Sequence, residues 1–233
     1  FKERENLKNP RCASVKMKLN KMNTPPLKLG IRANLGQFLI QTLLVLFVGI
    51  TIGLERSVVP VIAKEEFKIA STSVVLSFLV SFGFVKAFIN LMGGRLSESW
   101  GRKPLLIIGW IVAIPIPLII IHAPNWWWIV AANILMGINQ GLTWSMTVTS
   151  KMDIVGSRWR GLATGINEFA GYSGVASGAL ITSLIAANYG LRPAPFYFGL
   201  AIILIALLIA ILLAKETKSY VLVEAAANQG NAT

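Results

Sequence analysis

The sequence predicts an all-α integral membrane protein with six transmembrane helices. Hydrophobic residues make up 55% of the 233 residues and charged residues only 14%, whereas a soluble domain carries about 25% charged residues. The apolar residues form long continuous runs, which favours helices over the alternating strands of a membrane barrel. The formal net charge of +12 gathers at the ends of these runs, whereas a nucleic-acid-binding domain spreads its charge over a polar surface. Nucleic acid is therefore not an expected partner, and the lipid bilayer is.

The chain divides into three parts. Residues 1–34 carry nine Lys and Arg residues and no apolar period, which predicts a mobile basic cytoplasmic tail rather than a secretory leader. Residues 35–214 hold the predicted spans, and residues 215–233 are interpreted as a cytoplasmic tail or the start of a linker to a missing second half. A helix needs about 20 residues to cross the hydrocarbon core. The apolar stretches that reach or approach this length are 35–62, 70–93, 105–122, 126–149, 161–187 and 194–214.

The third stretch contains Pro115 and Pro117, which predict a kinked helix of the kind that neighbouring membrane helices tolerate. No catalytic residue, metal or cofactor is expected. Cys12 is the single cysteine, His122 is the single histidine, and no glycine-rich phosphate-binding loop is present.

The distribution of basic residues predicts the orientation. With the N-terminus in the cytoplasm, 17 of the 22 Lys and Arg residues fall on the cytoplasmic side, including Lys151 between the fourth and fifth stretches. Lys64, Lys68 and Arg192 fall on the opposite side. The positive-inside rule therefore places both termini in the cytoplasm, and residues 126–128, three tryptophans, at the outer interface.

The connection between the second and third stretches carries a dense polar motif, which reads Gly93-Gly94-Arg95-Leu96-Ser97-Glu98-Ser99-Trp100-Gly101-Arg102-Lys103-Pro104. Glycine allows a tight turn between two helices. Glu98 can pair locally, and the Arg102 guanidinium can bind carboxylates or the carbonyl groups at a helix end. We interpret the motif as a short cytoplasmic loop that holds neighbouring helix ends together.

This motif resembles the signature loop of the major facilitator superfamily in its spacing, in its place between spans two and three, and in its cytoplasmic side. Glu98 stands where the family usually has aspartate. The resemblance covers residues from about 35 to 218 and implies the N-terminal six-helix half of a bundle, built from two three-helix inverted repeats. It also implies a cytoplasmic charge network of Glu98 and Arg102 with Asp153 at the end of the fourth span. The cytoplasmic gate motif is then Gly94, Glu98, Gly101, Arg102, Lys103, Asp153 and Arg160.

Charged groups inside the spans are functional candidates, because a charge in the bilayer is costly. Glu55 and Arg56 lie toward the outer end of the first span and either line a cavity or extend to the interface. Lys86 lies in the second span, where the same two readings apply. Glu168 in the fifth span is our first candidate for binding a coupled proton or a cation. The other reading is a structural ion pair of Glu168 with Lys86 or Arg56.

The predicted transport cavity and coupling site comprises Glu55, Arg56, Lys86, Asn90, Asn139, Gln140, Asn167, Glu168 and Tyr172. The polar stripe of the fourth span either faces this cavity or joins helices through hydrogen bonds. Gly137 stands where drug–proton antiporters of the family have an arginine before the Gln140-Gly141 pair, and the Gly-Pro pair of their fifth span is absent. The glycines of the fifth span are interpreted as sites of close helix packing; they are Gly161, Gly165, Gly171, Gly174 and Gly178.

The resemblance implies a secondary active transporter of the cell membrane that moves a small molecule or ion by alternating access, with proton-coupled efflux as the preferred reading. Sequence around Asn167 and Glu168 resembles an export-type prokaryotic branch that includes metal-resistance and multidrug permeases. Two other classes stay open. One is a half-size channel or transporter that dimerises, and the other is a membrane scaffold that transports nothing.

Overall fold

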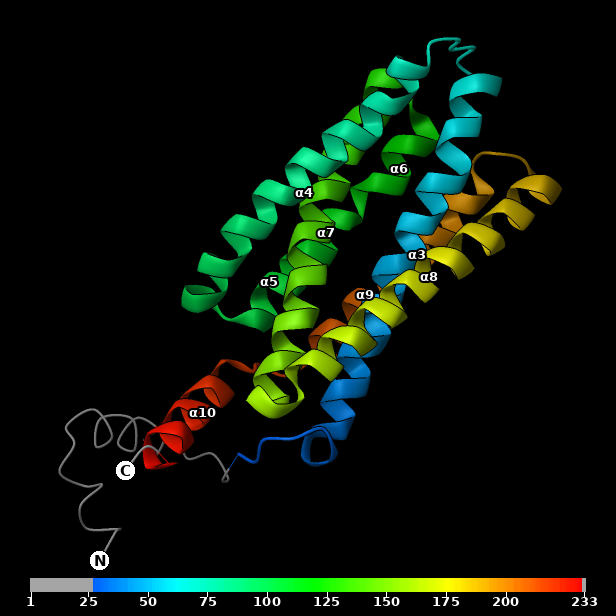
Figure 1. The fold of residues 1–233 in the computed structure, drawn as a ribbon. Helices are drawn as coiled ribbons and strands as arrows, with labels where there is room; N and C mark the ends of the chain where they lie inside the picture. Colours follow the sequence, from blue (N-terminus) through cyan, green and yellow to red (C-terminus); the bar gives the residue numbers. More distant parts are fainter. Residues whose placement is uncertain (1–26, 232–233) are drawn as a thin grey trace, which may run out of the picture.

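The structure of the protein is a computed structural model, and it describes residues 27–231. Every regular element in this range is helical (Figure 1). In chain order the elements are η2 (Arg32–Asn34), α3 (Leu35–Glu65), α4 (Thr72–Trp100), α5 (Arg102–Ala113), α6 (Pro115–His122), α7 (Trp126–Val155), η3 (Ser157–Trp159), α8 (Arg160–Tyr189), α9 (Ala194–Leu212) and α10 (Lys218–Asn231).

Within residues 27–231, five helical segments are long and apolar enough to cross a membrane. They contain α3, α4, the α5–α6 pair, α8 and α9. The 30-residue α7 covers the fourth expected span but is not among the five. Its apolar residues are interrupted by buried polar side chains such as Asn133, Asn139 and Gln140. The all-helical membrane character is confirmed, and five of the six expected spans meet the criterion of length and composition.

The kink predicted at the prolines of the third span is confirmed. α5 ends at Ala113 and α6 begins at Pro115, with Ile114 between them. Proline has no backbone N–H group to donate. At the first position of a helix this costs nothing, because an N–H there would have no partner within the helix.

The motif between the second and third spans is not the loop that the sequence suggested. α4 continues through Gly93, Gly94 and Trp100, and the turn consists of Gly101 alone, with φ of +95°. That backbone conformation suits glycine. The interpretation of the whole motif as a loop was wrong, because α4 continues beyond its apolar stretch to Trp100. Its last turn and the first turn of α5 are joined by a Glu98–Arg102 ion pair.

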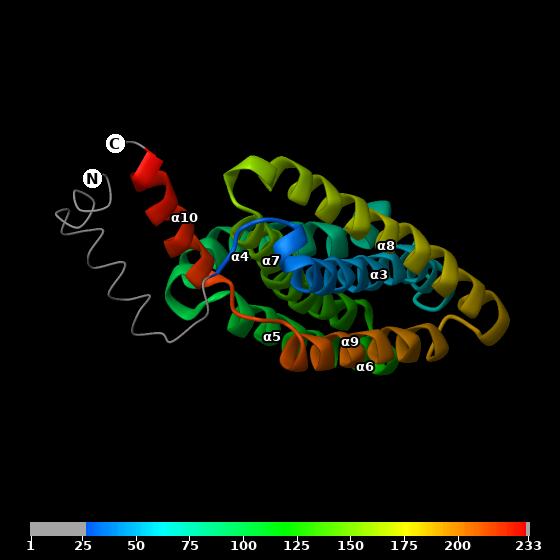
Figure 2. The ribbon, with the colours of Figure 1, turned by 90° about the horizontal axis from the view of Figure 1, so that it is seen from below.

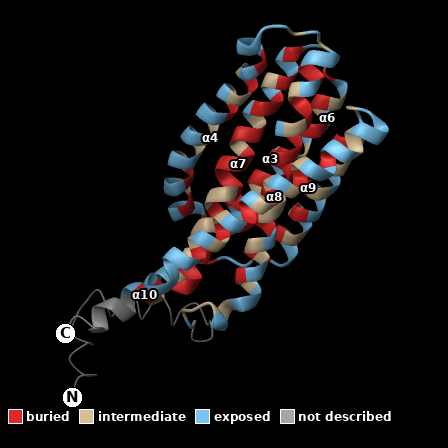
Figure 3. Cartoon of the chain, turned by 45° about the vertical axis from the view of Figure 1, so that its right-hand side comes forward, coloured by how far each residue is buried: buried red, intermediate tan, exposed pale blue. Residues whose placement is uncertain are grey.

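The helices pack in pairs. α3 contacts α8 most extensively, α4 packs on α7, and α7 also contacts α5 and α3. Seen from below, α5, α6 and α9 lie along one side of the bundle and α8 along the other (Figure 2). Burial follows this arrangement, since α7 and α3 are largely buried whereas α4 and α8 are exposed along much of their outer faces (Figure 3).

Close approach explains several glycines. A Cβ at Gly49 or Gly53 of α3 would collide with the backbone of α8, and a Cβ at Gly174 or Gly178 of α8 would collide with the backbone of α3. The prediction that glycines of the fifth span serve helix packing is confirmed at Gly174 and Gly178. It does not extend to Gly165, where a Cβ would meet nothing within 4 Å.

Both the segment before α3 and the segment after α9 are partly described by the structure. Residues 1–26, which contain most of the predicted mobile tail, lie outside the described part of the chain. Residues 27–34 contact the end of α7, because Gly30 N–H donates to the Ile154 carbonyl oxygen at 2.9 Å. The Asn34 side chain donates to the same oxygen at 3.2 Å. The final segment forms α10, within the part of the chain that the sequence predicts to be a tail or the start of a linker.

Candidate functional site

The first candidate site is a charge cluster centred on Arg102, the first residue of α5. Its guanidinium donates from Nε to Asp153 Oδ2 at 2.9 Å, from Nη2 to Glu98 Oε1 at 3.2 Å and from Nη1 to the Ser97 carbonyl oxygen at 2.8 Å. The Arg102 side chain is 3% exposed and that of Glu98 is 69% exposed. The Arg102–Asp153 pair is therefore the buried contact, and Glu98 closes the cluster toward solvent.

A segment that sequence reasoning missed completes this cluster. Glu216, which follows α9, accepts hydrogen bonds from the backbone N–H groups of Arg102 at 3.0 Å and Lys103 at 3.1 Å. Its neighbour Thr217 donates its hydroxyl to Asp153 Oδ2 at 2.9 Å. α5 has no capping side chain of its own. Glu216 therefore supplies a negative charge at the positive end of this helix from more than 110 residues further along the chain.

The charge state of Glu216 follows from these contacts. Partial burial disfavours the ionised form. The backbone N–H groups of Arg102, Lys218, Lys103 and Thr217 outweigh that effect and lower the pKa of the Glu216 carboxyl below its ordinary value. Gly101 belongs to the same arrangement, because a Cβ there would collide with the Glu216 carboxylate.

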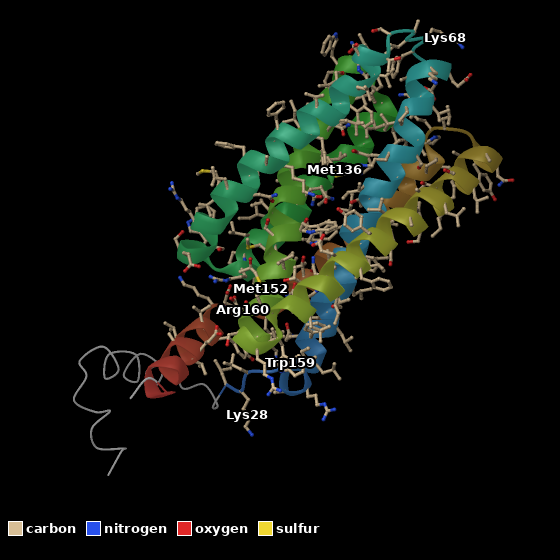
Figure 4. All side chains as sticks on the ribbon, in the orientation of Figure 1. Lys28, Lys68, Met136, Met152, Trp159 and Arg160 are labelled. Carbon is tan, nitrogen blue, oxygen red and sulfur yellow. The ribbon has the colours of Figure 1, made fainter. Side chains whose placement is uncertain are left out.

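The other residues predicted for the gate lie around this centre. The Lys103 ammonium donates to the Ile211 carbonyl oxygen at 2.8 Å, and Gly94 lies within α4, where its carbonyl oxygen accepts from Ser97. Arg160 pairs with Glu224 of α10 rather than with the Arg102 cluster. Figure 4 shows Arg160 at the same end of the molecule as Lys28, and Lys68 at the opposite end.

The second candidate site lies on facing sides of α4, α7 and α8. Glu168 of α8 accepts a hydrogen bond from the indole N–H of Trp144 at 3.0 Å and a second from Asn167 at 3.3 Å. Tyr172 packs edge-on against Trp144, with ring centroids 5.9 Å apart. The Lys86 ammonium lies 4.8 Å from the Trp144 ring centroid. These contacts gather four of the predicted cavity residues around one tryptophan.

Lys151 is the residue of this region that the sequence analysis misplaced. We counted it in a cytoplasmic connection, but α7 continues to Val155 and Lys151 is completely buried. Its ammonium donates to Asn167 Oδ1 at 2.9 Å and lies 5.7 Å from the Phe38 ring centroid. The charge pattern alone carried no signal of this, because a lysine near a span end ordinarily satisfies the positive-inside rule.

The remaining predicted cavity residues separate into two kinds. Asn90 contacts Ser145 at 2.8 Å on an exposed part of α4. Asn139 and Gln140 are instead fully buried, and each donates to the backbone of another helix: Asn139 to Gly109 of α5 and Gln140 to Val48 of α3. The polar stripe predicted on the fourth span comprises Asn133, Gly137, Gln140, Trp144 and Thr147. For Gln140, the contact with α3 matches the reading of hydrogen bonding between helices.

Glu55 and Arg56 of α3 point to different surroundings. Glu55 is 4% exposed, its Oε1 has no hydrogen-bond partner, and it borders two small pockets, both of which Met136 also lines. Met136 lies in the middle of the bundle (Figure 4). Arg56 is exposed. Among the described residues, neither Arg56 nor Lys86 forms an ion pair, so the structure does not bring Glu168 into an ion pair with either.

Within residues 27–231, no group of three or more His, Cys, Asp or Glu side chains is placed to hold a metal ion. The arrangement is therefore a helical membrane protein with a charge cluster at one end and an aromatic, charged site along its inner helices.

Comparison with known proteins identifies this class. The profile of the Major Facilitator Superfamily matches residues 41–232, and the chain belongs to this family. The resemblance drawn from the motif is thereby confirmed.

Two relatives are informative. The chain is 29% identical over 141 residues to "Multidrug resistance protein MdtG" of Serratia proteamaculans (strain 568), a match that covers 60% of this chain and 34% of that protein. Its fold is similar to that of the human organic anion transporter MFSD10 (TETRAN), with a TM-score of 0.66 and 18% identity, over 83% of this chain and 49% of that one. The chain thus spans about a third of the first and about half of the second.

Proposed function

We propose that the protein is a secondary active transporter of the cell membrane that moves a small solute by alternating access, with proton-coupled efflux as its mode. The observation that carries this proposal is the pairing of an interhelical charge cluster at one end with charged side chains in the middle of the spans. Family membership supports transport in general, and the efflux reading draws on the bacterial relative, which is named a multidrug resistance protein.

The proposed architecture is the N-terminal six-helix half of a transporter, in which α7 is the fourth of six spans. Helix pairing supports two inverted repeats, α3–α4–α5/α6 and α7–α8–α9. In these repeats α3 corresponds to α7, α4 to α8, and the α5–α6 pair to α9. The α3–α8 contact then corresponds to the α7–α4 contact, and the α5–α7 contact corresponds to the α9–α3 contact. All four contacts are extensive. Glycines four residues apart recur at matching contacts, Gly49 with Gly53 on α3 and Gly137 with Gly141 on α7.

The proposed gate is the cytoplasmic cluster. Arg102, Asp153 and Glu98 join the ends of α4, α5 and α7, and Glu216 ties the segment after α9 to the same point. Such a cluster stabilises one arrangement of the helix ends, and its rupture accompanies the change to the other arrangement. Both termini of the chain then lie in the cytoplasm, with Lys68 on the outer side.

The proposed coupling groups are the carboxylates of Glu168 and Glu55, the acids that lie away from both ends of the described membrane-spanning helices. A carboxylate in a bilayer is retained where it binds a proton, an ion or a substrate. Glu168 is the stronger candidate, because it shares a site with Trp144, Tyr172 and Lys86 and is partly exposed.

Inside-out membrane vesicles that contain the full chain test this function. An acidic lumen should drive accumulation of at least one of two dyes, the cation ethidium or the anion fluorescein. An ionophore that dissipates the proton gradient should abolish it. Glu168→Gln should remove the response to the gradient at unchanged membrane abundance. Accumulation of both dyes that ignores the proton gradient and the membrane potential would contradict proton coupling.

Two other functions predict different results. A scaffold predicts that Glu168→Gln and Lys86→Ala leave every phenotype unchanged. A half-size protein predicts cross-linked dimers of this chain in the membrane. A gene that encodes six further spans with a second copy of the motif supports the two-half transporter and contradicts the half-size reading.

A further inference from the structure

Two cations from different helices lie against the same phenyl ring. The Arg56 guanidinium carbon of α3 is 6.0 Å from the Phe82 ring centroid, and the Lys86 ammonium of α4 is 5.6 Å from it. Lys86 also lies over the Trp144 ring at 4.8 Å. Contacts with aromatic faces orient a cation but leave its hydrogen-bond donors available to another group.

Neither cation has an anionic partner within the part of the chain that the structure describes. The ion pairs of that part involve Arg102, Arg160 and Arg192, and not Arg56 or Lys86. Lys86 is seven residues from Gly93, where the apolar stretch of α4 ends, which is about 10 Å of helix rise. An unpaired cation at this depth is stabilised by water or by a ligand.

Arg56, one of the two cations, lines a pocket between α3 and α4. Its volume is about 440 Å³, and Arg56, Pro60, Phe78, Leu79, Phe82 and Gly83 line it. Pockets of about 300 to 1,000 Å³ hold drug-sized ligands. The lining is apolar except for Arg56. Lys86 lies one helical turn beyond Phe82, outside this lining, and its ammonium contacts the same ring.

Within the described residues, the nearby acids form no ion pair with these cations. Glu55 borders a separate small pocket with Arg56 and Phe82, yet it is buried and forms no ion pair with Arg56. Glu168 accepts its hydrogen bonds from Trp144 and Asn167. The charged residue that lines the pocket is a cation, Arg56, and the partly exposed Lys86 lies beside the pocket against Phe82.

We propose that the pocket lined by Arg56 and Phe82, with Lys86 beside it, binds organic anions, molecules with an aryl or alkyl body and one carboxylate or sulfonate group. This inference rests on the proposed transport function and adds a substrate class to it. Arg56 and Lys86 bind the oxyanion through charge-assisted hydrogen bonds, and Phe78, Leu79 and Phe82 contact the apolar body. A cationic molecule of the same shape meets two like charges and is rejected.

Two probes of one shape and opposite charge test the proposal. Naphthalene-2-sulfonate and trimethyl(2-naphthyl)ammonium are titrated calorimetrically into the full chain in nanodiscs of zwitterionic lipid. The sulfonate should bind about tenfold or more tightly than the ammonium compound, because the sulfonate accepts a charge-assisted hydrogen bond where the ammonium compound is repelled. Arg56→Gln and Lys86→Gln should each weaken sulfonate binding about tenfold, and Arg56→Lys should weaken it less.

The control is Lys64→Gln, which removes an exposed cation from the same helix outside the pocket and should leave binding unchanged. Equal binding of both probes, or unchanged sulfonate binding in Arg56→Gln and Lys86→Gln, overturns the proposal. The vesicle assay separates it from the transport function. Gradient-driven ethidium accumulation without sulfonate binding contradicts only the substrate class, and selective sulfonate binding without any flux contradicts only transport.

Discussion

Arg102 at the start of α5 and Asp153 at the end of α7 form a hydrogen-bonded ion pair of 2.9 Å although 51 residues separate them in the chain. Both side chains are more than nine-tenths buried. Their mutual attraction offsets the loss of water only while both are present. The pair therefore makes the position of α5 dependent on that of α7.

Arg102→Ala should lower the stability of the protein by about 3 kcal/mol or more, because it leaves the Asp153 carboxylate buried without its cation. Arg102→Lys should be intermediate, since an ammonium cannot reproduce three donors on a planar group. Thermal unfolding in detergent measures both. Arg95→Gln, which changes an exposed arginine of α4, is the control. An Arg102→Ala protein as stable as this control would show that the pair does not hold the helices.

Glu216 should make the stability of the folded protein depend on pH. Its pKa is lowered in the folded protein from an ordinary value of 4.5, so its contribution is fully present above that value and is lost as the pH falls through the folded pKa. Glu216→Ala should therefore destabilise the protein at pH 7, by about 1 kcal/mol as for the loss of a helix cap. The difference from the unchanged protein should shrink below about pH 4. Melting curves of both proteins at pH 7 and at pH 3.5 check this, and a difference that grows on acidification would contradict it.

The sequence was sufficient for the features that depend on local pattern. The apolar runs placed the helices, Pro115 placed the break between α5 and α6, and the spacing of Glu98 and Arg102 placed the charge motif. Each depends on residues close together in the chain or on a pattern that a family shares. Glu216 and Thr217 escaped this reasoning, because their partners are brought to them only by the folding of the whole bundle.

The pattern of apolar residues also did not predict where the helices end. Apolar composition marks the part of a helix that lipid covers, whereas the hydrogen-bonded helix continues as long as its polar turns find partners. α4 therefore extends to Trp100 and α7 to Val155. Because α7 extends to Val155, Lys151 lies in the protein interior and not in the predicted connection. There it donates to Asn167, which in turn donates to Glu168.

Two glycines of α8 should respond differently to the same change. Gly174→Ala should destabilise the protein by about 1 to 3 kcal/mol, because its Cβ would collide with the Leu46 carbonyl oxygen of α3 and force the helices apart. Gly165→Ala should be neutral or slightly stabilising, since a Cβ there meets nothing within 4 Å and alanine favours helix. Thermal unfolding compares them. Equal effects of both substitutions would mean that the α3–α8 contact does not require the close approach.

The buried Lys151–Asn167 contact predicts an asymmetry between two single variants. Asn167→Ala should destabilise the protein by about 3 kcal/mol, because it leaves a completely buried ammonium without its acceptor. Lys151→Met removes the charge itself while its side chain still packs beside Phe38, so its effect should be smaller. The double variant should be more stable than Asn167→Ala alone, which a double-mutant cycle of unfolding free energies measures. Additive single effects would show that the lysine and the asparagine do not depend on one another.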